Sequence, residues 1–296
     1  MPSAALRQLT VLEDADAMSV ELSAACQKEG ALVSWLRRHE RIAIGFSGGV
    51  DSTYLACVAV DTLGAANVLA IIGKSASYPA VQWASARAVA DRFAIPILEV
   101  DTHEMEDPRY AANPSNRCYF CKSELWSLLV PIANARGIDT VIDGTNADDL
   151  SGHRPGAAAA RERSVESPLA LVGFTKAEIR ALSQARDIPT WAQPSSPCLS
   201  SRIPYGTAVT AARLAEVERA EAALRALGIA GDLRVRHHGE LARVEIGAEE
   251  LSAWLTTEGR ASVGAAVHGA GFTRVAIDLR GFRSGSLNVL TGVTAA

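Results

Sequence analysis

A turn rich in glycine and serine is the first feature of this sequence whose residues could do chemistry. The run Ser47-Gly48-Gly49-Val50-Asp51-Ser52 follows a short apolar stretch and precedes an apolar segment of helical length. This order predicts a strand, a tight turn and a helix N-terminus, whose backbone N–H groups can hold a phosphate. The two glycines let the backbone approach the oxygens, and the serines add hydroxyl donors. An ordinary strand–turn–helix built from small residues is the alternative.

Cysteines form the second candidate site. Cys118 and Cys121 make a C-x-x-C pair, and Cys198 lies farther along the chain, whereas Cys26 and Cys57 occupy alanine-rich segments typical of a core. A C-x-x-C pair is ambiguous among a redox dithiol, half of a zinc site and part of an iron–sulfur site. Zinc usually takes four protein ligands, whereas three thiolates suit a [4Fe–4S] cluster with one open iron. A zinc site and three unrelated buried cysteines remain alternatives.

The glycine-rich turn lacks the lysine that follows the glycines in ATPases that cleave the γ-phosphate. Its six residues resemble instead the PP-loop of ATP pyrophosphatases, which split ATP between the α and β phosphates and adenylate a substrate. The resemblance implies that Asp51 acts in catalysis and helps to hold Mg²⁺ against the phosphates. It also implies four further ATP-binding residues in this turn, namely Ser47, Gly48, Gly49 and Ser52.

A longer resemblance covers about residues 20–290. The PP-loop, the run Asn116-Arg117-Cys118-Tyr119-Phe120-Cys121-Lys122 and the run from Pro197 to Gly206 together resemble the LarE family. Members are ATP-dependent sulfur transferases that build the nickel-pincer nucleotide cofactor of lactate racemase. The resemblance implies that ATP adenylates the carboxylates of pyridinium-3,5-biscarboxylic acid mononucleotide, and that sulfur then displaces AMP to leave thiocarboxylates.

This family delivers sulfur in two ways. In one, a lone cysteine at the position of Cys198 attacks the acyl adenylate and ends as dehydroalanine. In the other, cysteines at the positions of Cys118, Cys121 and Cys198 bind a [4Fe–4S] cluster that carries an extra sulfide and turns over repeatedly. Because this chain has all three, the cluster route is expected, with Cys198 catalytic and with sulfide or a sulfur-donor system as a partner.

Arginines are expected to converge on the nucleotide substrate, which carries a phosphate and carboxylates. Arg234 and Arg236 alternate on a predicted strand and therefore share one face. A solvated strand face is the alternative for these two residues. By resemblance, the substrate-binding positions are Ser201, Arg202, Arg234, Arg236 and Glu245.

An α/β fold must position these residues. Helical stretches such as 80–93 and 122–135 alternate with short apolar runs at 42–46, 68–72, 97–100 and 140–143. The alternation predicts a parallel sheet covered by helices on both faces, and the resemblance implies a PP-loop, adenine nucleotide alpha hydrolase-like fold. Ligands bind at the carboxyl ends of such strands. The expected ATP-binding residues at these ends are Gly73, Lys74, Ser75 and Gly144.

The pattern of apolar and polar residues changes beyond about residue 206. A long amphipathic helix at 210–227 and alternating strands at 233–237 and 242–246 predict a smaller α+β unit. We therefore divide the chain into a PP-loop domain, residues 1–195, and a C-terminal substrate-binding and oligomerisation domain, residues 196–296. The alanine run 157–160 is interpreted as part of a mobile loop over the site.

Composition narrows the function classes. The chain has 296 residues, of which 48% are hydrophobic and 21% charged, and a net charge of -4, so a nucleic-acid partner is not expected. No apolar run reaches the length of about 18 residues needed for a membrane span. The N-terminus lacks the pattern of a secretion signal, so we expect a cytoplasmic protein, acting as a homo-oligomer.

Other function classes remain open. A cluster-dependent tRNA thiolase can also combine a PP-loop with cysteines, but it should carry a basic RNA-binding surface or an added RNA-binding domain. An amidating PP-loop ligase leaves the three cysteines unexplained. An ATP-binding module without catalysis is the alternative outside the enzymes.

Overall fold

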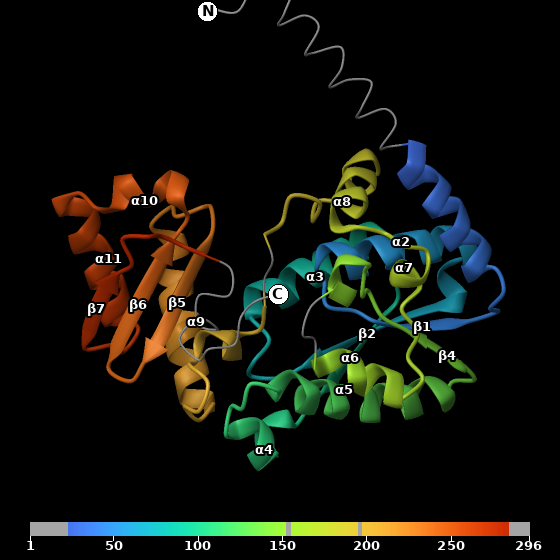
Figure 1. The fold of residues 1–296 in the computed structure, drawn as a ribbon, viewed down its shortest axis with the longest axis horizontal. Coiled ribbons are helices and arrows are strands. Elements are labelled where there is room, and N and C mark those ends of the chain that lie inside the picture. The colour runs from blue at the N-terminus through green and yellow to red at the C-terminus, as the bar shows by residue number, and fades with distance from the viewer. Residues whose placement is uncertain (1–22, 152–154, 195–196, 284–296) are drawn as a thin grey trace, which may run out of the picture.

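The larger part of the protein is built around a four-stranded parallel sheet. The computed structural model describes residues 23–151, 155–194 and 197–283. The sheet has the order β3-β2-β1-β4 (Figure 1) and confirms the predicted α/β class. Its strands are β1 (Ile42–Gly45), β2 (Val68–Lys74), β3 (Ile97–Asp101) and β4 (Thr140–Ile142). Because all four run the same way, their carboxyl ends meet at one edge of the sheet.

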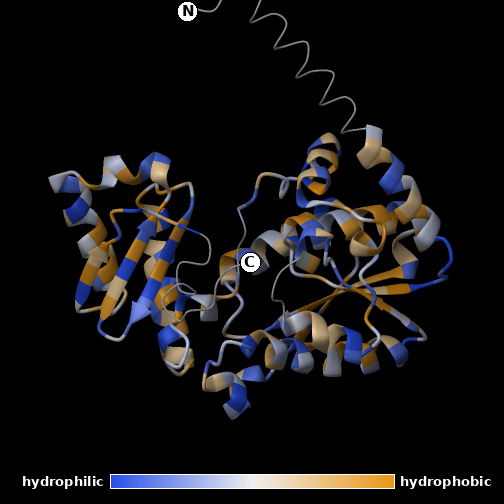
Figure 2. Ribbon diagram, viewed as in Figure 1, coloured by the Kyte–Doolittle hydropathy of each residue, from blue (hydrophilic) through white to orange (hydrophobic). Residues whose placement is uncertain are grey.

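Helices cover both faces of this sheet. Successive strand residues point to opposite faces, so Ile42 and Ile44 pack into one core cluster and Ala43 into another. The first face is covered by α2 (Val50–Leu63), α3 (Ala80–Arg92) and α8 (Lys176–Ala185). The second is covered by α5 (Arg117–Asn134) and α6 (Pro155–Glu162). Figure 2 shows the strands between them as largely apolar.

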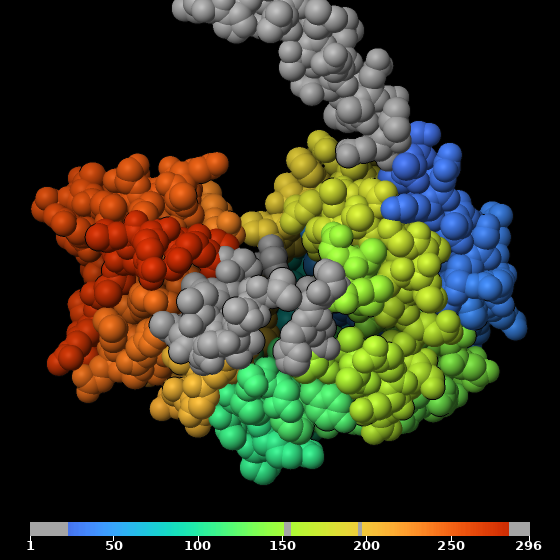
Figure 3. Space-filling model, viewed as in Figure 1, coloured from blue at the N-terminus to red at the C-terminus, as the bar shows by residue number. Residues whose placement is uncertain are grey.

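A second, three-stranded sheet forms a smaller lobe (Figure 3). Its β5 and β6 are antiparallel, and β7 is parallel to β6. The elements are α9 (Ala211–Ala226), β5 (Leu233–His238), β6 (Leu241–Ile246), α10 (Ala248–Trp254), α11 (Thr257–Gly269) and β7 (Arg274–Ile277). The predicted domain boundary at 195/196 lies outside the described residues and stays a prediction.

Two interpretations of the sequence are wrong. Residues 157–160 are not a loop but lie in α6, because alanine is the strongest helix former and Ala159 and Ala160 are buried. Cys57 is buried as expected, but Cys26 is exposed on a helix over residues 23–36. Across the described ranges, no helix combines the length and the apolar character needed to cross a membrane.

Candidate active site

The glycine-rich turn joins the end of β1 to the N-terminus of α2. Gly48 has a φ of +67°, and a Cβ there would lie 2.4 Å from the Cβ of Ala86 in α3. Both the backbone conformation and the close helix therefore require glycine. Gly49 is the N-cap residue of α2 and makes no side-chain cap, so the first N–H groups of the helix are available to an anion.

Side chains of α3 and of the segment just before it hold this turn in place by hydrogen bonds. The Oγ atoms of Ser47 and Ser52 lie 3.1 Å apart. The Ser47 carbonyl accepts hydrogen bonds from the Tyr78 hydroxyl at 2.8 Å and from the Gln82 side-chain amide at 3.0 Å. The predicted ATP-binding serines therefore lie in a single, well-supported turn.

Asp51 occupies the first turn of α2 and meets two other elements. The Asn146 side-chain amide donates to one carboxylate oxygen at 3.3 Å, and the Lys176 ammonium forms an ion pair with the other. Gly144 lies at the end of β4, where a Cβ would be 2.8 Å from the backbone N of Ser52. The fold therefore brings Asp51, Gly144 and the turn together. Lys176, 125 residues from Asp51, is a site residue that the sequence reasoning missed.

The end of β2 carries the remaining predicted ATP-binding residues. Gly73 lies under Leu125, whose Cδ1 would be 2.3 Å from an added Cβ. The Lys74 ammonium lies 4.7 Å from the centroid of the Trp83 ring and 3.9 Å from Glu99. The Ser75 hydroxyl donates to Glu104 at 2.5 Å. The role of these three residues in ATP binding stays a prediction.

Glu104 is a second residue that the sequence reasoning missed. Its carboxylate is 2% exposed and accepts hydrogen bonds from Ser75, Ser77 (2.9 Å) and Thr102 (2.7 Å). Three hydroxyl donors satisfy a buried carboxylate that no periodic pattern marks. The Ser77 carbonyl also accepts the Leu199 N–H at 2.8 Å, so this cluster connects the nucleotide end of the sheet to the segment of Cys198.

The three predicted cluster ligands lie on two segments that contact each other. Cys118 and Cys121 lie three residues apart in the first turn of α5, which begins at Arg117 rather than at residue 122 as predicted. Cys198 directly precedes a short 3-10 helix, Leu199–Arg202. Burial raises the pKa of both the Cys118 and the Cys121 thiol, and negative charge on Cys198 raises each of them further. The hydrogen bond from Arg117 to the Ser200 carbonyl places the segment of Cys198 beside the start of α5.

A network of hydrogen bonds holds the Cys198 segment against α5. The buried Arg117 guanidinium donates to the Ser200 carbonyl at 3.0 Å and to the Asn113 side chain. The hydroxyls of Tyr110 and Ser200 lie 2.6 Å apart. Positive charge on Arg117 and Lys122 lowers the pKa of Cys118 against the effect of burial. Cations beside thiols favour the thiolate, which is the form that binds metal.

The donor set fits an iron–sulfur cluster in its chemistry. Three thiols on contacting segments offer soft sulfur ligands, and the cations Arg117 and Lys122 beside Cys118 would offset the negative charge of a bound cluster. Within the part of the chain that the structure describes, no three His, Cys, Asp or Glu side chains are already arranged to hold a metal ion. The ligand roles of Cys118, Cys121 and Cys198 stay predictions.

The predicted substrate-binding residues also gather in one place. Arg234 and Arg236 are each 5% exposed, so the solvated-face alternative is wrong for this strand. Arg236 donates to Glu245 at 3.0 Å and to the Ser201 carbonyl at 3.1 Å. Burial, with the neighbouring charge of Arg202, lowers the pKa of Arg234 to about 10. Arg202 and Arg236 are paired with Glu221 and Glu245, and a phosphate beside Arg234 would offset the repulsion that this guanidinium meets from the other two.

Arg202 connects this arginine cluster to Cys198. Its guanidinium donates to both carboxylate oxygens of Glu221 in α9, at 2.9 and 3.0 Å, and to the Cys198 carbonyl at 3.1 Å. Bidentate pairing of this kind fixes an arginine in orientation as well as in place. Glu221 was missed because nothing distinguishes it from the other acidic residues of an amphipathic helix.

Comparisons with known proteins agree with this geometry. The sequence model of the NAD synthase family matches residues 34–113, which include the glycine-rich turn. An uncharacterized protein of Synechocystis is 46% identical over 85% of this chain and 94% of its own length. An uncharacterized protein of Methanocaldococcus jannaschii is 27% identical over 83% of this chain and 92% of its own.

The third relative has a named activity. The pyridinium-3,5-bisthiocarboxylic acid mononucleotide synthase of Lactiplantibacillus plantarum is 33% identical over 88% of this chain and 94% of its own length. The chain therefore belongs to the LarE family of ATP-using, sulfur-transferring enzymes.

Proposed function

We propose that this protein adenylates the carboxylates of pyridinium-3,5-biscarboxylic acid mononucleotide and converts them to thiocarboxylates for the nickel-pincer nucleotide cofactor. The name of the L. plantarum relative supports the choice of substrate. One observation supports the proposal: the glycine-rich turn at the N-terminus of α2 and the segments of the three cysteines are held by one fold. The bond from the Leu199 N–H to the Ser77 carbonyl joins their surroundings.

In the first step, a substrate carboxylate oxygen attacks the α-phosphorus of ATP. The bond from that phosphorus to the bridging oxygen breaks, pyrophosphate leaves with the electron pair, and an acyl adenylate forms. The N–H groups at the start of α2 would bind phosphate oxygens, and Asp51 would hold the Mg²⁺ that neutralises the leaving charge. Arg234 and Arg236 would hold the phosphate of the mononucleotide.

In the second step, sulfide attacks the acyl carbon. A carbon–sulfur bond forms, the bond from carbon to the phosphate oxygen breaks, and AMP leaves, so that a thiocarboxylate remains. A [4Fe–4S] cluster held by Cys118, Cys121 and Cys198 would supply this sulfide in activated form. Arg117 and Lys122 would hold the negative charge that gathers at the thiols.

A test of this function supplies anaerobically purified protein with ATP, Mg²⁺, the biscarboxylic mononucleotide and sulfide. We expect AMP, pyrophosphate and more than one thiocarboxylate per chain by mass spectrometry, with Cys198 unchanged. A loss of about 34 Da at Cys198, the mass of H₂S, would mark dehydroalanine and the sacrificial route instead. Absence of substrate-dependent pyrophosphate release would contradict the proposed function as a whole.

A further inference from the structure

Two neighbouring residues, Ser77 and Tyr78, contact the two parts of the site that the proposed reaction uses in succession. The Ser77 carbonyl accepts the N–H of Leu199, one residue beyond Cys198, at 2.8 Å. The Tyr78 hydroxyl donates to the Ser47 carbonyl in the glycine-rich turn, also at 2.8 Å. A single step along the chain therefore connects the nucleotide turn to the segment of Cys198.

The Ser77 end of this connection is fixed by the buried carboxylate of Glu104. Ser77 is 4% exposed, and its hydroxyl donates to Glu104 Oε1 at 2.9 Å. The same carboxylate accepts the hydroxyls of Ser75, which follows β2, and of Thr102, which follows β3. A buried carboxylate is costly unless donors satisfy it, so the three hydroxyls are held around it. Residues 75–77 are thereby tied to the ends of two strands of the sheet.

The Tyr78 end is fixed as well. Its ring packs against the core cluster that includes α2, and burial raises the pKa of its hydroxyl, which therefore stays protonated and donates. The Ser47 carbonyl has a second donor, the side-chain amide of Gln82, at 3.0 Å. The two donors differ in what they connect, because Gln82 belongs to α3, whereas Tyr78 directly follows the residue that holds Leu199.

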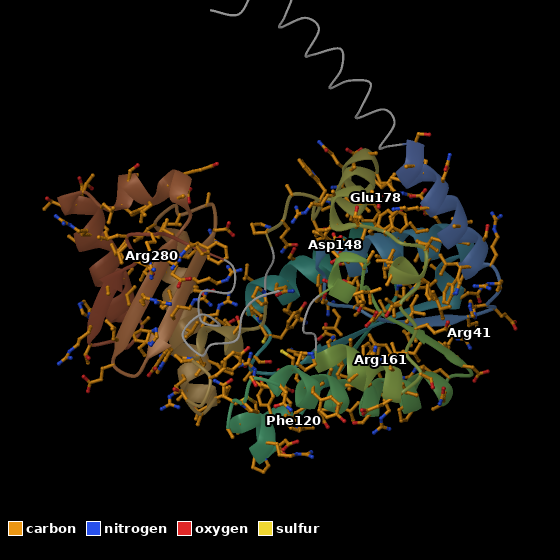
Figure 4. All side chains as sticks on the ribbon, viewed as in Figure 1. Arg41, Phe120, Asp148, Arg161, Glu178 and Arg280 are labelled. Atoms are coloured by element: carbon orange, nitrogen blue, oxygen red, sulfur yellow. The ribbon has the colours of Figure 1, made fainter. Side chains whose placement is uncertain are left out.

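The proposed reaction needs a fixed spacing between these two parts of the site. The acyl adenylate forms at the nucleotide turn, and its acyl carbon must then meet sulfide held at the cysteines. Figure 4 shows Phe120, between Cys118 and Cys121, well apart from Asp148, whose loop contacts the first turn of α2. Groups that act in successive steps must be held in register, because a misplacement of about 1 Å can slow a step by about 10²-fold.

Water competes with sulfide for the same acyl carbon. A water molecule that attacks it displaces AMP, loses its protons to solvent and returns the original carboxylate. ATP is then consumed without formation of a thiocarboxylate. The spacing between the nucleotide turn and the sulfur therefore decides how much of the acyl adenylate is used productively.

We propose that Ser77 and Tyr78, anchored by Glu104, are positioning residues that hold the acyl adenylate in register with the sulfur and so favour sulfur transfer over hydrolysis. This role rests on the proposed function, because it requires adenylation and sulfur transfer in one molecule. The three residues act through Ser47 and Leu199. They determine which nucleophile reaches the acyl carbon rather than how fast the carboxylate is activated.

The test measures how the acyl adenylate is divided between these two fates. Anaerobically purified, full-length wild type, Tyr78→Phe, Glu104→Gln and Gln82→Leu receive Mg²⁺–ATP, the biscarboxylic mononucleotide and sulfide. The AMP released in excess of thiocarboxylate, divided by the thiocarboxylate, gives the rate of hydrolysis relative to sulfur transfer. We expect Tyr78→Phe, which keeps the ring, to raise this ratio by about 2- to 10-fold, the range for one lost neutral hydrogen bond.

The other two variants serve as a parallel test and a matched control. Glu104→Gln should also raise the ratio, because an amide nitrogen cannot accept a hydroxyl. Gln82→Leu removes the other donor to the same Ser47 carbonyl and should leave the ratio at the wild-type value. Substrate-dependent pyrophosphate release should continue in Tyr78→Phe, since Gln82 still holds that carbonyl.

Hydrogen exchange on the same proteins, without substrate, examines the contact itself. Glu104→Gln should speed amide exchange in the peptide that contains Leu199, because the N–H of that residue is bonded to the Ser77 carbonyl. Gln82→Leu should leave this peptide unchanged. Unchanged exchange in Glu104→Gln would contradict the anchoring role of Glu104.

The kinetic results separate positioning from its alternatives. If Tyr78→Phe releases pyrophosphate and keeps the wild-type ratio, the positioning role fails and the proposed function stands. If Tyr78→Phe loses pyrophosphate release, or if Gln82→Leu raises the ratio equally, a general loosening of the turn explains the effect and the role is contradicted. If wild type itself shows no substrate-dependent pyrophosphate release, the proposed function fails, and the positioning role fails with it.

Discussion

At the scale of single residues, Arg117 is a buried cation that lies beside the segments of the three predicted cluster ligands. Burial acts to lower the pKa of this guanidinium, but the ionisable neighbours Cys198, Cys118, Tyr110 and Tyr205 together raise it above its usual range. Arg117 donates hydrogen bonds to the Ser200 carbonyl and the Asn113 side chain, and a further side-chain hydrogen bond to Cys118 lowers the pKa of that thiol. A buried cation is costly unless an anion accompanies it, so Arg117 favours an anionic group bound at these thiols.

Replacing Arg117 by methionine should therefore lower the iron and sulfide retained by anaerobically purified protein, whereas Arg117→Lys should keep part of both. Lysine keeps the positive charge of Arg117 whereas methionine keeps only part of its volume, so we expect the charge to decide how much iron is retained. Iron and acid-labile sulfide assays on the purified variants check this. Equal iron content in Arg117→Met and wild type would return Arg117 to a purely structural role.

Each of the three thiols should also be needed for iron. We expect Cys118→Ala, Cys121→Ala and Cys198→Ala each to lose iron and sulfide together, because a cluster with one ligand removed is exposed to solvent and exchange. Cys26→Ala should retain both, since Cys26 is exposed on a distant helix. Retention of iron by any of the three variants would contradict the cluster assignment at that position.

Arg234 is the residue best suited to test substrate binding. Arg234→Ala should raise KM for the mononucleotide more than it lowers kcat, because a phosphate grip acts alike in the ground and transition states. Arg280→Ala is the control in the same lobe, since its side chain is 68% exposed and pairs with Asp278. Steady-state kinetics measure KM and kcat for both variants. If Arg234→Ala has the same KM and kcat as Arg280→Ala, Arg234 does not bind the substrate.

At the scale of elements, much of the fold was predictable and the starts of helices were less so. The predicted strands at 42–46, 68–72 and 97–100 differ by one or two residues from β1, β2 and β3, because apolar runs of this length are typical of buried strands. The start of α5 was placed five residues late, since nothing apolar marks Arg117 as helical. The buried Arg117 side chain donates a hydrogen bond to the Ser200 carbonyl, which lies far along the sequence.

The capping box of α8 was also predictable from sequence, and it provides a prediction at this scale. Thr175→Ala should lower the free energy of unfolding by about 1 kcal/mol and weaken Mg²⁺–ATP binding, because Lys176 of α8 forms an ion pair with Asp51 of the nucleotide turn. Thr210→Ala removes the N-cap of α9, a helix of the other lobe, and should cost similar stability without affecting ATP. Urea unfolding measures the stability of the two variants, and calorimetry measures their affinity for Mg²⁺–ATP. Equal affinities would contradict the connection between the N-cap of α8 and the nucleotide turn.

At the scale of the whole molecule, the two lobes are joined by residues far apart in sequence. Asn113 is fully buried with a φ of +57°, and its side-chain amide donates to the carbonyls of Ile203, Pro204 and Thr207. Contacts across about 90 residues leave no periodic trace, so the sequence could not predict how Cys198 meets α5. The predicted homo-oligomer and cytoplasmic location stay predictions.

Asn113→Ala should be strongly destabilising, because each buried carbonyl left without a donor costs about 1–3 kcal/mol. Asn113→Gly should be less harmful than alanine, since glycine accepts the positive φ. Thermal unfolding of both variants tests this order, and the reverse order would show that backbone strain is not part of the cost.

Two glycines of the nucleotide sheet have different evolutionary prospects. A side chain on Gly45 would meet the Trp126 ring at 2.4 Å, so a smaller residue at 126 can make room for it. A side chain on Gly144 would meet backbone atoms of Ser52 and Asp51, at 2.8 to 3.2 Å, which no substitution can shrink. Among diverging descendants, positions 45 and 126 can therefore change as a pair, whereas position 144 has no partner that can rescue it.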